Sequence, residues 1–305
     1  ARTASASATI TALASDQQPG VSAPATISLF EDTPTALSGI GFSQAVNNGA
    51  TVTVRLLVDS GMLSTAADDA LVVTQSDGAT QLRGTLDAIN RYMATGGVVF
   101  TPAADSTSSV SLISNITEGV AGQAGALSAS ATTSLTIIAV NDAPTVTGAT
   151  TFTVTEDEQG ALRGILFADV DAEAGAVTAT LRVGAGTLLA DSTPGVSVTG
   201  NGHSVTLQGH LSDINAYIGA GHLSFRTDPD ATDDVRLDIA IDDNANSGSG
   251  GALSAQRLGT IGVIPVNDAP RLVSAAANRL VTSSDPMLFQ LPAAGFFDPD
   301  VGDVL

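Results

Sequence analysis

The sequence of 305 residues contains no cysteine, no tryptophan and no lysine. The lack of cysteine excludes disulfide bonds and thiolate metal sites, so a bound hard cation is a remaining way to staple small domains. Aromatic residues make up only 4% of the chain, and the cores must therefore be aliphatic. There is no apolar run long enough for a transmembrane helix and no charged-then-apolar leader. We expect the sequence to be a piece of a larger protein.

The charge is strongly one-sided, with a formal net value of −20 at pH 7. Such a field repels nucleic acid and anionic membrane surfaces, so we expect neither a nucleic-acid partner nor direct membrane insertion. Aspartate outnumbers glutamate 26 to 5. Short aspartate side chains suit turns and the loops that bind hard cations. The composition favours cation binding, and a salt-adapted acidic surface is the alternative.

Internal repeats organise the chain. The linker Val-Asn-Asp-Ala-Pro occurs at 140–144 and again at 266–270. Residues 82–92 and 207–217 share the pattern Leu-x-Gly-x-Leu-x-x-Ile-Asn-x-Tyr at an offset of 125. A constant offset over this distance indicates two copies of one structural unit.

The linkers predict four segments. Residues 1–20 are expected to be the last strand, near 8–13, and the linker of a preceding repeat. Residues 21–143 and 144–269 are two complete repeats, and 270–305 begin a truncated third repeat.

Each repeat is predicted to be all-β. Short β-branched runs alternate with turn residues, and Val235–Ile241 alternates apolar and polar residues, as a half-buried strand does. Seven or eight short strands in about 125 residues fit a β-sandwich, with one helical turn at 211–218. The predicted strands of the second repeat are 150–156, 161–168, 176–183, 195–200, 203–209, 222–227, 235–242 and 259–266. The aromatic pairs that recur at the same offset are predicted to lie in the cores: Phe42 and Phe167, Tyr92 and Tyr217, Phe100 and Phe225.

Carboxylates are expected to gather at the two poles of each repeat, because strand direction alternates in an antiparallel sandwich. Calcium takes six to eight oxygen ligands in flexible geometry, and these sets can supply them. The predicted set at the later junction is Glu156, Asp157, Asp228, Asp230, Asn267 and Asp268, completed by Asp298 and Asp300. The predicted set at the earlier junction is Glu31, Asp32, Asp105, Asn141 and Asp142, completed by Asp169, Asp171, Asp242 and Asp243.

The first repeat departs from this pattern at its own entry pole, which is the end where the chain enters the repeat. Gln44 and Val46 stand where the second repeat has its Asp-x-Asp pair, and Thr117 and Glu118 replace its two later aspartates. A junction near Asp16 is therefore predicted to bind calcium poorly.

Any one of these aspartates taken alone is an ordinary turn former, and only their joint clustering favours a cation site. We interpret a further set of aspartates as solvated turns. These are Asp68, Asp69, Asp191, Asp233 and Asp234.

The Val-Asn-Asp-Ala-Pro linkers, the shared 11-residue pattern and the Glu-Asp near each repeat start resemble tandem cadherin-like repeats of giant bacterial surface proteins, including RTX-type adhesins and VCBS-repeat proteins. The stretch 296–303 is similar to the start of dystroglycan-type cadherin-like units. The resemblance implies Ig-like or cadherin-like Greek-key β-sandwiches in an elongated array, with Ca²⁺ between repeats. It also implies a secreted or cell-surface location, neighbouring repeats as partners, and a host or cell-surface glycan or protein bound by other domains.

No motif for catalysis is found. His203, His210 and His222 lack metal-ligand spacing, and neither a Gly-x-Ser-x-Gly elbow nor a phosphate-binding loop occurs. The sequence therefore predicts a structural or adhesive spacer and no enzyme. A self-associating surface-layer, sheath or filament subunit is one alternative, and accessory repeats of a secreted exoenzyme are another.

Overall fold

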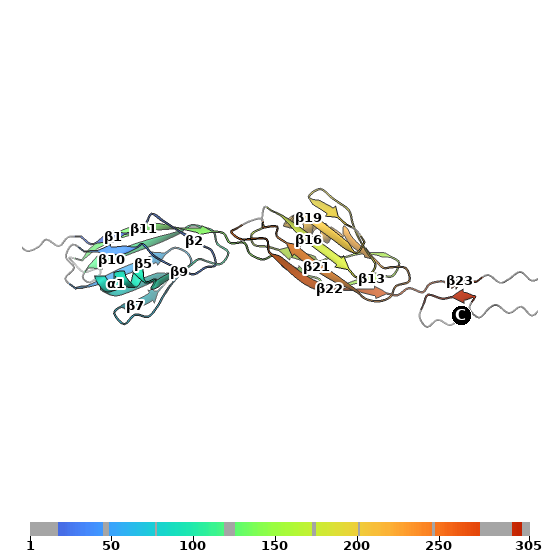
Figure 1. The fold of residues 1–305 in the computed structure, drawn as a ribbon, viewed down its shortest axis with the longest axis horizontal. Helices are drawn as coiled ribbons and strands as arrows, with labels where there is room; N and C mark the ends of the chain where they lie inside the picture. Colours follow the sequence, from blue (N-terminus) through green and yellow to red (C-terminus); the bar gives the residue numbers. More distant parts are fainter. Residues whose placement is uncertain are drawn as a thin grey trace, which may run out of the picture. The chain divides into compact units, whose positions relative to one another are not determined.

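A computed structural model describes residues 18–44, 49–76, 78–118, 126–172, 175–200, 202–245, 248–274 and 295–300. The chain forms two compact units, Ala1–Val140 and Asn141–Leu305 (Figure 1). The predicted strand at 8–13, together with Asp16 and Val46, lies outside the described residues. The predicted division into four segments stays a prediction.

The first unit packs a large sheet against smaller ones (Figure 1). The six-stranded sheet has the order β2 (Thr26–Phe30), β11 (Leu127–Ile138), β10 (Val110–Glu118), β5 (Thr51–Val58), β8 (Ala79–Thr85), β7 (Val72–Ser76). The smaller sheets are β3 (Thr35–Ala36), β9 (Val98–Thr101), β6 (Met62–Thr65), and the pair β1 (Gly20–Ser22), β4 (Gly41–Ser43). Helix α1 (Leu86–Ala94) is capped at its N-terminus by Thr85, whose hydroxyl accepts a hydrogen bond from the Ala88 amide.

The second unit repeats this order. Its six-stranded sheet is β13 (Thr151–Thr155), β22 (Ser254–Ile264), β21 (Val235–Asp242), β16 (Ala176–Val183), β19 (Ser204–His210), β18 (Val196–Thr199). The smaller sheets are β14 (Gln159–Ala161), β20 (Leu223–Arg226), β17 (Thr187–Ala190), and the pair β12 (Thr145–Gly148), β15 (Ile165–Ala168). Helix α2 spans Leu211–Ala220, and a further pair joins β23 (Arg271–Leu272) to β24 (Phe296–Phe297).

The all-β prediction is confirmed, and so are the predicted helix in the second repeat and the strand at 235–242. Other predictions were wrong in detail. The predicted strand 161–168 is interrupted at 162–164, because Gly164 has a left-handed φ of 86° and its carbonyl bonds the Ala149 amide. Strands β12 and β17 had not been predicted.

The sheets are not wholly antiparallel. β2 pairs parallel to β11, and β13 pairs parallel to β22, because the chain crosses from the small entry sheet to the free edge of the last strand. In the second unit this crossing is tight. The Thr150 carbonyl accepts a bond from the Thr260 amide and lies 2.8 Å from where a Cβ on Gly259 would be.

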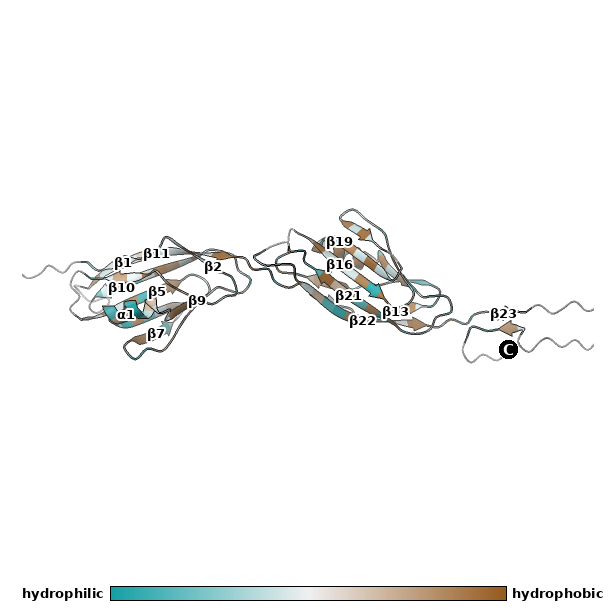
Figure 2. Cartoon of the chain, in the orientation of Figure 1, coloured by the Kyte–Doolittle hydropathy of each residue, from teal (hydrophilic) through white to brown (hydrophobic). Residues whose placement is uncertain are grey.

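Each unit has its own aliphatic core, and hydrophobic residues concentrate on the strands (Figure 2). In β16, Val177, Ala179 and Leu181 are buried, and the residues between them point outward. The prediction of aromatic core residues is confirmed, since Phe100 and Phe225 are fully buried.

The repeated Ile-Asn-x-Tyr pattern braces the helix of each unit. The side-chain amides of Asn90 and Asn215 each bond the backbone of one phenylalanine. Asn90 Oδ1 accepts from the Phe42 amide at 2.9 Å and its Nδ2 donates to the Phe42 carbonyl at 2.8 Å, and Asn215 makes the same two bonds in the second unit. In the second unit that phenylalanine is Phe167, on the strand that ends beside Asp169. The hydroxyl of Tyr217 donates to the Asp191 carbonyl, and burial raises its pKa above the ordinary value. The contact of Asn215 with Phe167 holds the end of β15, which Asp169 directly follows.

Candidate metal sites

A buried glutamate lies at the exit pole of each unit, which is the end where the chain leaves the unit. Glu31 and Glu156 follow β2 and β13, and their exposed fractions are only 1% and 2%. The Val140 amide donates to Glu31 Oε1 at 2.8 Å, and the Val266 amide donates to Glu156 Oε1. In both units the glutamate therefore holds the first residue of the Val-Asn-Asp-Ala-Pro linker.

The aspartate after each glutamate turns the chain. Asp32 and Asp157 have left-handed φ values of 53° and 57°, which aspartate tolerates better than most residues. Their carboxylates accept from the amides of Asp105 and Asp230 at 3.3 and 3.4 Å. Two loops that each bear an acidic residue are thus brought together at the same pole of each unit.

The linker aspartates make a repeated contact with an Asp-x-Asp pair. The Asp142 amide donates to Asp171 Oδ2 at 2.6 Å, and the Asp171 amide donates to Asp169 Oδ1 at 2.9 Å. The same contacts recur further along the chain. The Asp268 amide donates to Asp300 Oδ2 at 2.6 Å, and the Asp300 amide donates to Asp298 Oδ1 at 3.2 Å.

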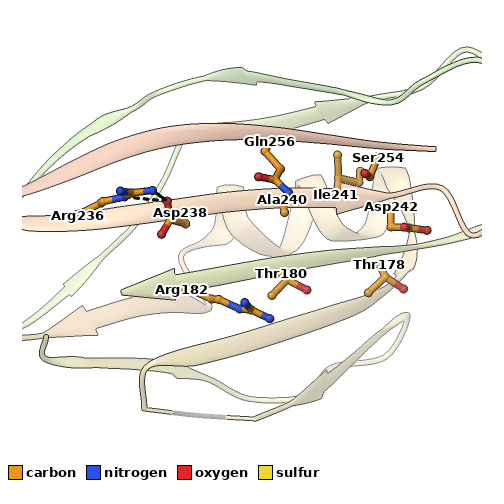
Figure 3. A pocket seen from close by; sticks show the side chains of 10 residues that line it. All are labelled: Thr178, Thr180, Arg182, Arg236, Asp238, Ala240, Ile241, Asp242, Ser254 and Gln256. Carbon is orange, nitrogen blue, oxygen red and sulfur yellow. Dashed lines mark hydrogen bonds and ion pairs between the residues drawn. The ribbon is translucent and has the colours of Figure 1, made fainter. Parts of the chain in front are cut away.

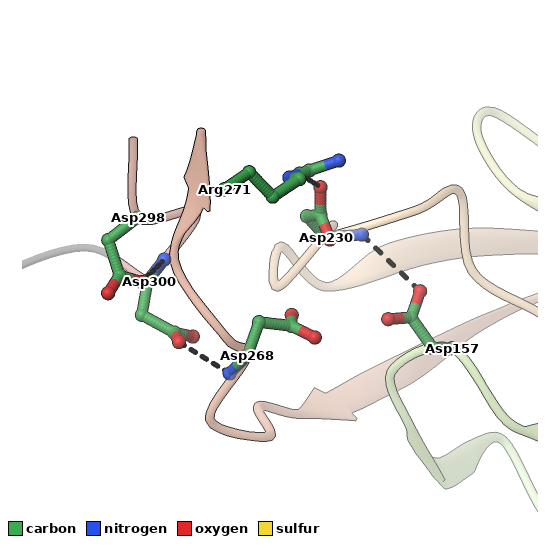
Figure 4. Close-up of polar contacts among 6 residues, drawn as sticks. All are labelled: Asp157, Asp230, Asp268, Arg271, Asp298 and Asp300. Atoms are coloured by element: carbon green, nitrogen blue, oxygen red, sulfur yellow. Dashed lines mark hydrogen bonds and ion pairs between the residues drawn. The ribbon is translucent and has the colours of Figure 1, made fainter. Parts of the chain in front are cut away.

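Carboxylates converge at the exit pole of the second unit (Figure 4). One group contains Glu156, Asp268 and Asp300, and another contains Asp157, Asp230 and Asp268, each with one oxygen per residue within 4.8 Å of the others. Calcium–oxygen distances of about 2.3–2.6 Å place opposite ligands roughly 5 Å apart. Each group therefore has the spacing of oxygens around one calcium ion, and Asp268 belongs to both.

The electrostatics of this pole favour a cation. The pKa of Asp268 is raised above the ordinary value, first by partial burial and then by the charges of Asp230, Asp157, Asp300 and Glu156. A divalent ion would reverse that repulsion.

The Arg271 guanidinium already neutralises part of this charge. It pairs with Asp230 at the rim of the cluster (Figure 4). Sequence reasoning missed this residue. Its signal was that the position one repeat earlier holds an uncharged residue, Thr145.

At the entry pole of the second unit, Asn141 is 7% exposed and bonds the loop between β21 and β22. Its amide nitrogen donates to Asp243 Oδ2 at 2.6 Å and to the Gly251 carbonyl at 3.1 Å. Asn141 Oδ1 and Asp169 Oδ2 are buried and accept no hydrogen bond from the described residues. Buried oxygens of this kind are suitable cation ligands.

Asp243 is held in its ionised form at this pole. Burial acts to raise its pKa, but bonds from the amides of Ala245 and Leu253 and from Asn141 outweigh burial, and the pKa lies below the ordinary value.

Three predicted ligands lie apart from these clusters. The Asp242 carboxylate lies on the outward side of β21 and accepts from the Asn244 amide at 2.8 Å. Asp228 accepts from the Gly186 amide at 3.0 Å. Asn267 is exposed, and its side chain donates to the Asp268 carbonyl at 3.3 Å. Strand alternation explains Asp242, because adjacent residues of one strand face opposite ways.

The roles of Glu31, Asp32 and Asp105 in a site shared with the next unit stay a prediction. At the entry pole of the first unit, Gln44 Oε1 and Glu118 Oε1 are buried and accept no hydrogen bond from the described residues. The expectation of weak calcium binding there also stays a prediction.

No protein-family model matches the chain, and no curated protein matches it. Among solved structures, mouse cadherin-23 EC22-24 is 15% identical with a TM-score of 0.42, and the match covers 85% of this chain and 71% of that one. Human protocadherin-24 EC1-2 is 11% identical, with a TM-score of 0.38 and coverage of 82% and 100%. Drosophila N-cadherin EC1-4 is 14% identical, with a TM-score of 0.34 and coverage of 83% and 50%. At TM-scores below 0.5 these likenesses carry no conclusion about function.

Proposed function

We propose that the chain is a structural or adhesive spacer segment of a large bacterial extracellular protein, in which Ca²⁺ bound between successive repeats stiffens a rod. The observation that carries the proposal is the repeated contact of a linker aspartate with an Asp-x-Asp pair, at Asp142 with Asp171 and at Asp268 with Asp300. The same contact between a linker aspartate and an Asp-x-Asp pair occurs twice, each time beside other carboxylates. This repetition favours a shared role of both contacts in cation binding.

Calcium suits these positions better than other common cations. The available ligands are carboxylate and amide oxygens on several loops, and calcium accepts many oxygens in flexible geometry. Magnesium needs near-ideal octahedral geometry and keeps several waters, and no histidine or cysteine in the described part of either cluster would favour zinc.

The proposed role needs no reaction. Its partners are the neighbouring repeats of the same chain, and a ligand-binding domain elsewhere in the protein would contact the host or another cell. Extracellular calcium modules work with dissociation constants of about 10⁻⁴–10⁻³ M, which matches a secreted or surface location. Among the described residues, neither helix is long and apolar enough to cross a membrane.

Small-angle X-ray scattering in calcium and in a chelator, at constant ionic strength, tests the proposal. We expect a longer and stiffer particle in calcium. The variant Asp169→Ala with Asp171→Ala should lose most of that change and bind fewer calcium ions by calorimetry, with both cores still folded.

The matched control removes two exposed turn aspartates, Asp69→Ala with Asp191→Ala, and should behave like the parent chain. If the parent shows no calcium response, or if both double variants lose it equally, the calcium-spacer proposal is wrong. Concentration-dependent growth of particles in calcium would instead support a self-associating surface-layer or filament subunit.

A further inference from the structure

A hollow of about 440 Å³ lies on the outward face of the large sheet of the second unit, over β16, β21 and β22 (Figure 3). It is separate from the clustered pole carboxylates, and Asp242, which lies apart from those clusters, is the one predicted metal ligand that lines it. The calcium proposal leaves this face without a role.

The register of three strands explains the hollow. Thr180 pairs with Ala240, and Ala240 pairs with Gln256, so the small side chains of Thr180 and Ala240 form the floor at the centre. One row away, Arg182 is paired with Asp238. The long side chains of Arg182, Arg236 and Gln256 therefore lie around a low centre (Figure 3).

The first unit does not build this hollow from the equivalent positions. Arg55 and Asn115 are paired there, in place of Thr180 and Ala240. Both replacements are larger, and Leu57 stands where the second unit has Arg182. The hollow is thus a property of the second unit that its fold does not require.

The rim of the hollow carries two guanidinium groups, of Arg182 and Arg236, and two carboxylates, of Asp238 and Asp242. Arg236 holds Asp238 through two nitrogens, at 2.6 and 2.9 Å from Oδ1. Arg182 is exposed and makes no ion pair with the described residues. Asp242 accepts from the Asn244 amide, so the Arg182 guanidinium is the charge on the rim that has no ion-pair or hydrogen-bond partner of its own among the described residues. A guanidinium fork left in this state is suited to a carboxylate supplied by a ligand.

We propose that this hollow binds a saccharide that carries a carboxylate, such as a chain containing uronic acid. Arg182 would receive the carboxylate, and Gln256 with the hydroxyl of Ser254 would bond the ring hydroxyls. The hydroxyls of Thr178 and Thr180 already bond Asn244 and Thr206. No aromatic residue lines the hollow, so recognition rests on charge and hydrogen bonds and not on ring stacking.

An acidic peptide fits this face less well. β16 and β21 are central strands that are paired on both sides, so a peptide cannot add to the sheet at this point. The lining also offers no deep apolar pocket for a side-chain anchor, because Ala240 forms its floor and Ile241 is buried in the core.

Titration of the ¹⁵N-labelled full chain with a hyaluronan tetrasaccharide tests the proposal, with uncharged chitotetraose and tetraglutamate as comparison ligands. We expect amide shifts confined to residues of β16, β21 and β22 around the hollow. The same shifts should appear in calcium and in a chelator, which separates this result from the fate of the calcium proposal.

Two variants replace a residue of the hollow by the residue at the equivalent position of the first unit. Arg182→Leu and Ala240→Asn should each weaken binding by about tenfold or more, because one removes the free guanidinium and the other fills the floor. Arg55→Leu makes the same charge change on the first unit and should leave the affinity unaltered.

The proposal is overturned if the tetrasaccharide shifts no amide around the hollow. It is equally overturned if Arg182→Leu and Arg55→Leu weaken binding alike, or if tetraglutamate binds there as tightly as the tetrasaccharide. A chitotetraose affinity equal to that of hyaluronan would remove the role of the carboxylate and contradict the proposal as well.

Discussion

Two pairs of residues that lie 125 apart in the two units, one buried and one facing outward, show how the units differ. The buried pairs Phe100 and Phe225 keep their identity and are both fully inaccessible to solvent. The outward pair Asn115 and Ala240 differs in size and in polarity. A side chain in a close-packed interior must match its neighbours in volume, whereas an outward side chain on a sheet is free to change. Differences between the units on their outward faces therefore point to functions that the shared fold does not dictate.

The two cores should be equally sensitive to truncation. Phe100→Ala and Phe225→Ala should each lower the free energy of unfolding of their own unit by about 3–5 kcal/mol, because each leaves a large cavity. Hydrogen exchange measured by mass spectrometry during denaturation would assign each loss to a unit. A much smaller loss in one unit would show that its core is looser than the equal burial indicates.

Calcium removal should change the stability of the two units by different amounts, whereas the core variants should change it equally. The second unit has grouped carboxylates at its exit pole and the hydrogen-bonded Asp142, Asp171 and Asp169 at its entry pole, whereas the first has Gln44 and Glu118 at its entry pole. At a calcium concentration 100 times the dissociation constant, each site adds about 2.7 kcal/mol. We expect a chelator to lower the melting temperature of the second unit more than that of the first. Equal shifts in both units would contradict the proposed difference between their entry poles.

Acidification without calcium should partly relieve the repulsion between carboxylates at the exit pole of the second unit. The pKa of Asp268 is raised in the folded protein, so the folded state holds this proton more tightly than the unfolded state. Its contribution to stability is therefore most favourable below the unfolded pKa and is lost as pH rises through the folded pKa.

The variant Asp268→Asn should accordingly flatten this part of the acid profile and raise the melting temperature at neutral pH in a chelator. In calcium the same variant should lower it, because a ligand oxygen loses its charge. Melting curves between pH 4 and 7 in both buffers measure this, and a change of the same sign in both would contradict the role of Asp268.

The smallest predicted effect concerns one core position. Ser114 is fully buried, and its hydroxyl has no hydrogen-bond partner among the described residues, whereas the equivalent residue of the second unit is Ile239. Ser114→Ala should raise the stability of the first unit by about 1 kcal/mol, because a buried hydroxyl without a partner is costly. The control Thr133→Ala removes a hydroxyl that donates to the Pro24 carbonyl at 2.9 Å, and it should destabilise the same unit. Denaturant titration of both variants would test the contrast.

Much of the fold could be predicted, because its signals are local or repeated. Alternation of apolar residues located the strand at 235–242, and the helical spacing of Leu211, Ile214 and Ile218 located helix α2. The parallel pairing of β13 with β22 could not be predicted, because it joins segments about a hundred residues apart and leaves no periodicity in either. The hollow over β16, β21 and β22 was missed for a similar reason, since its residues become neighbours only through the register of three strands.

The sequence by itself determined that this protein is all-β, repeated, acidic and free of disulfides, because composition and spacing alone carry those properties. Only the tertiary structure decided which carboxylates meet. It brought Glu156 and Asp300 to Asp268 and set Asp242 aside on the opposite face of its strand. The physical reason is that a cation responds to distances of a few ångströms between oxygens, and such distances arise from strand direction and register.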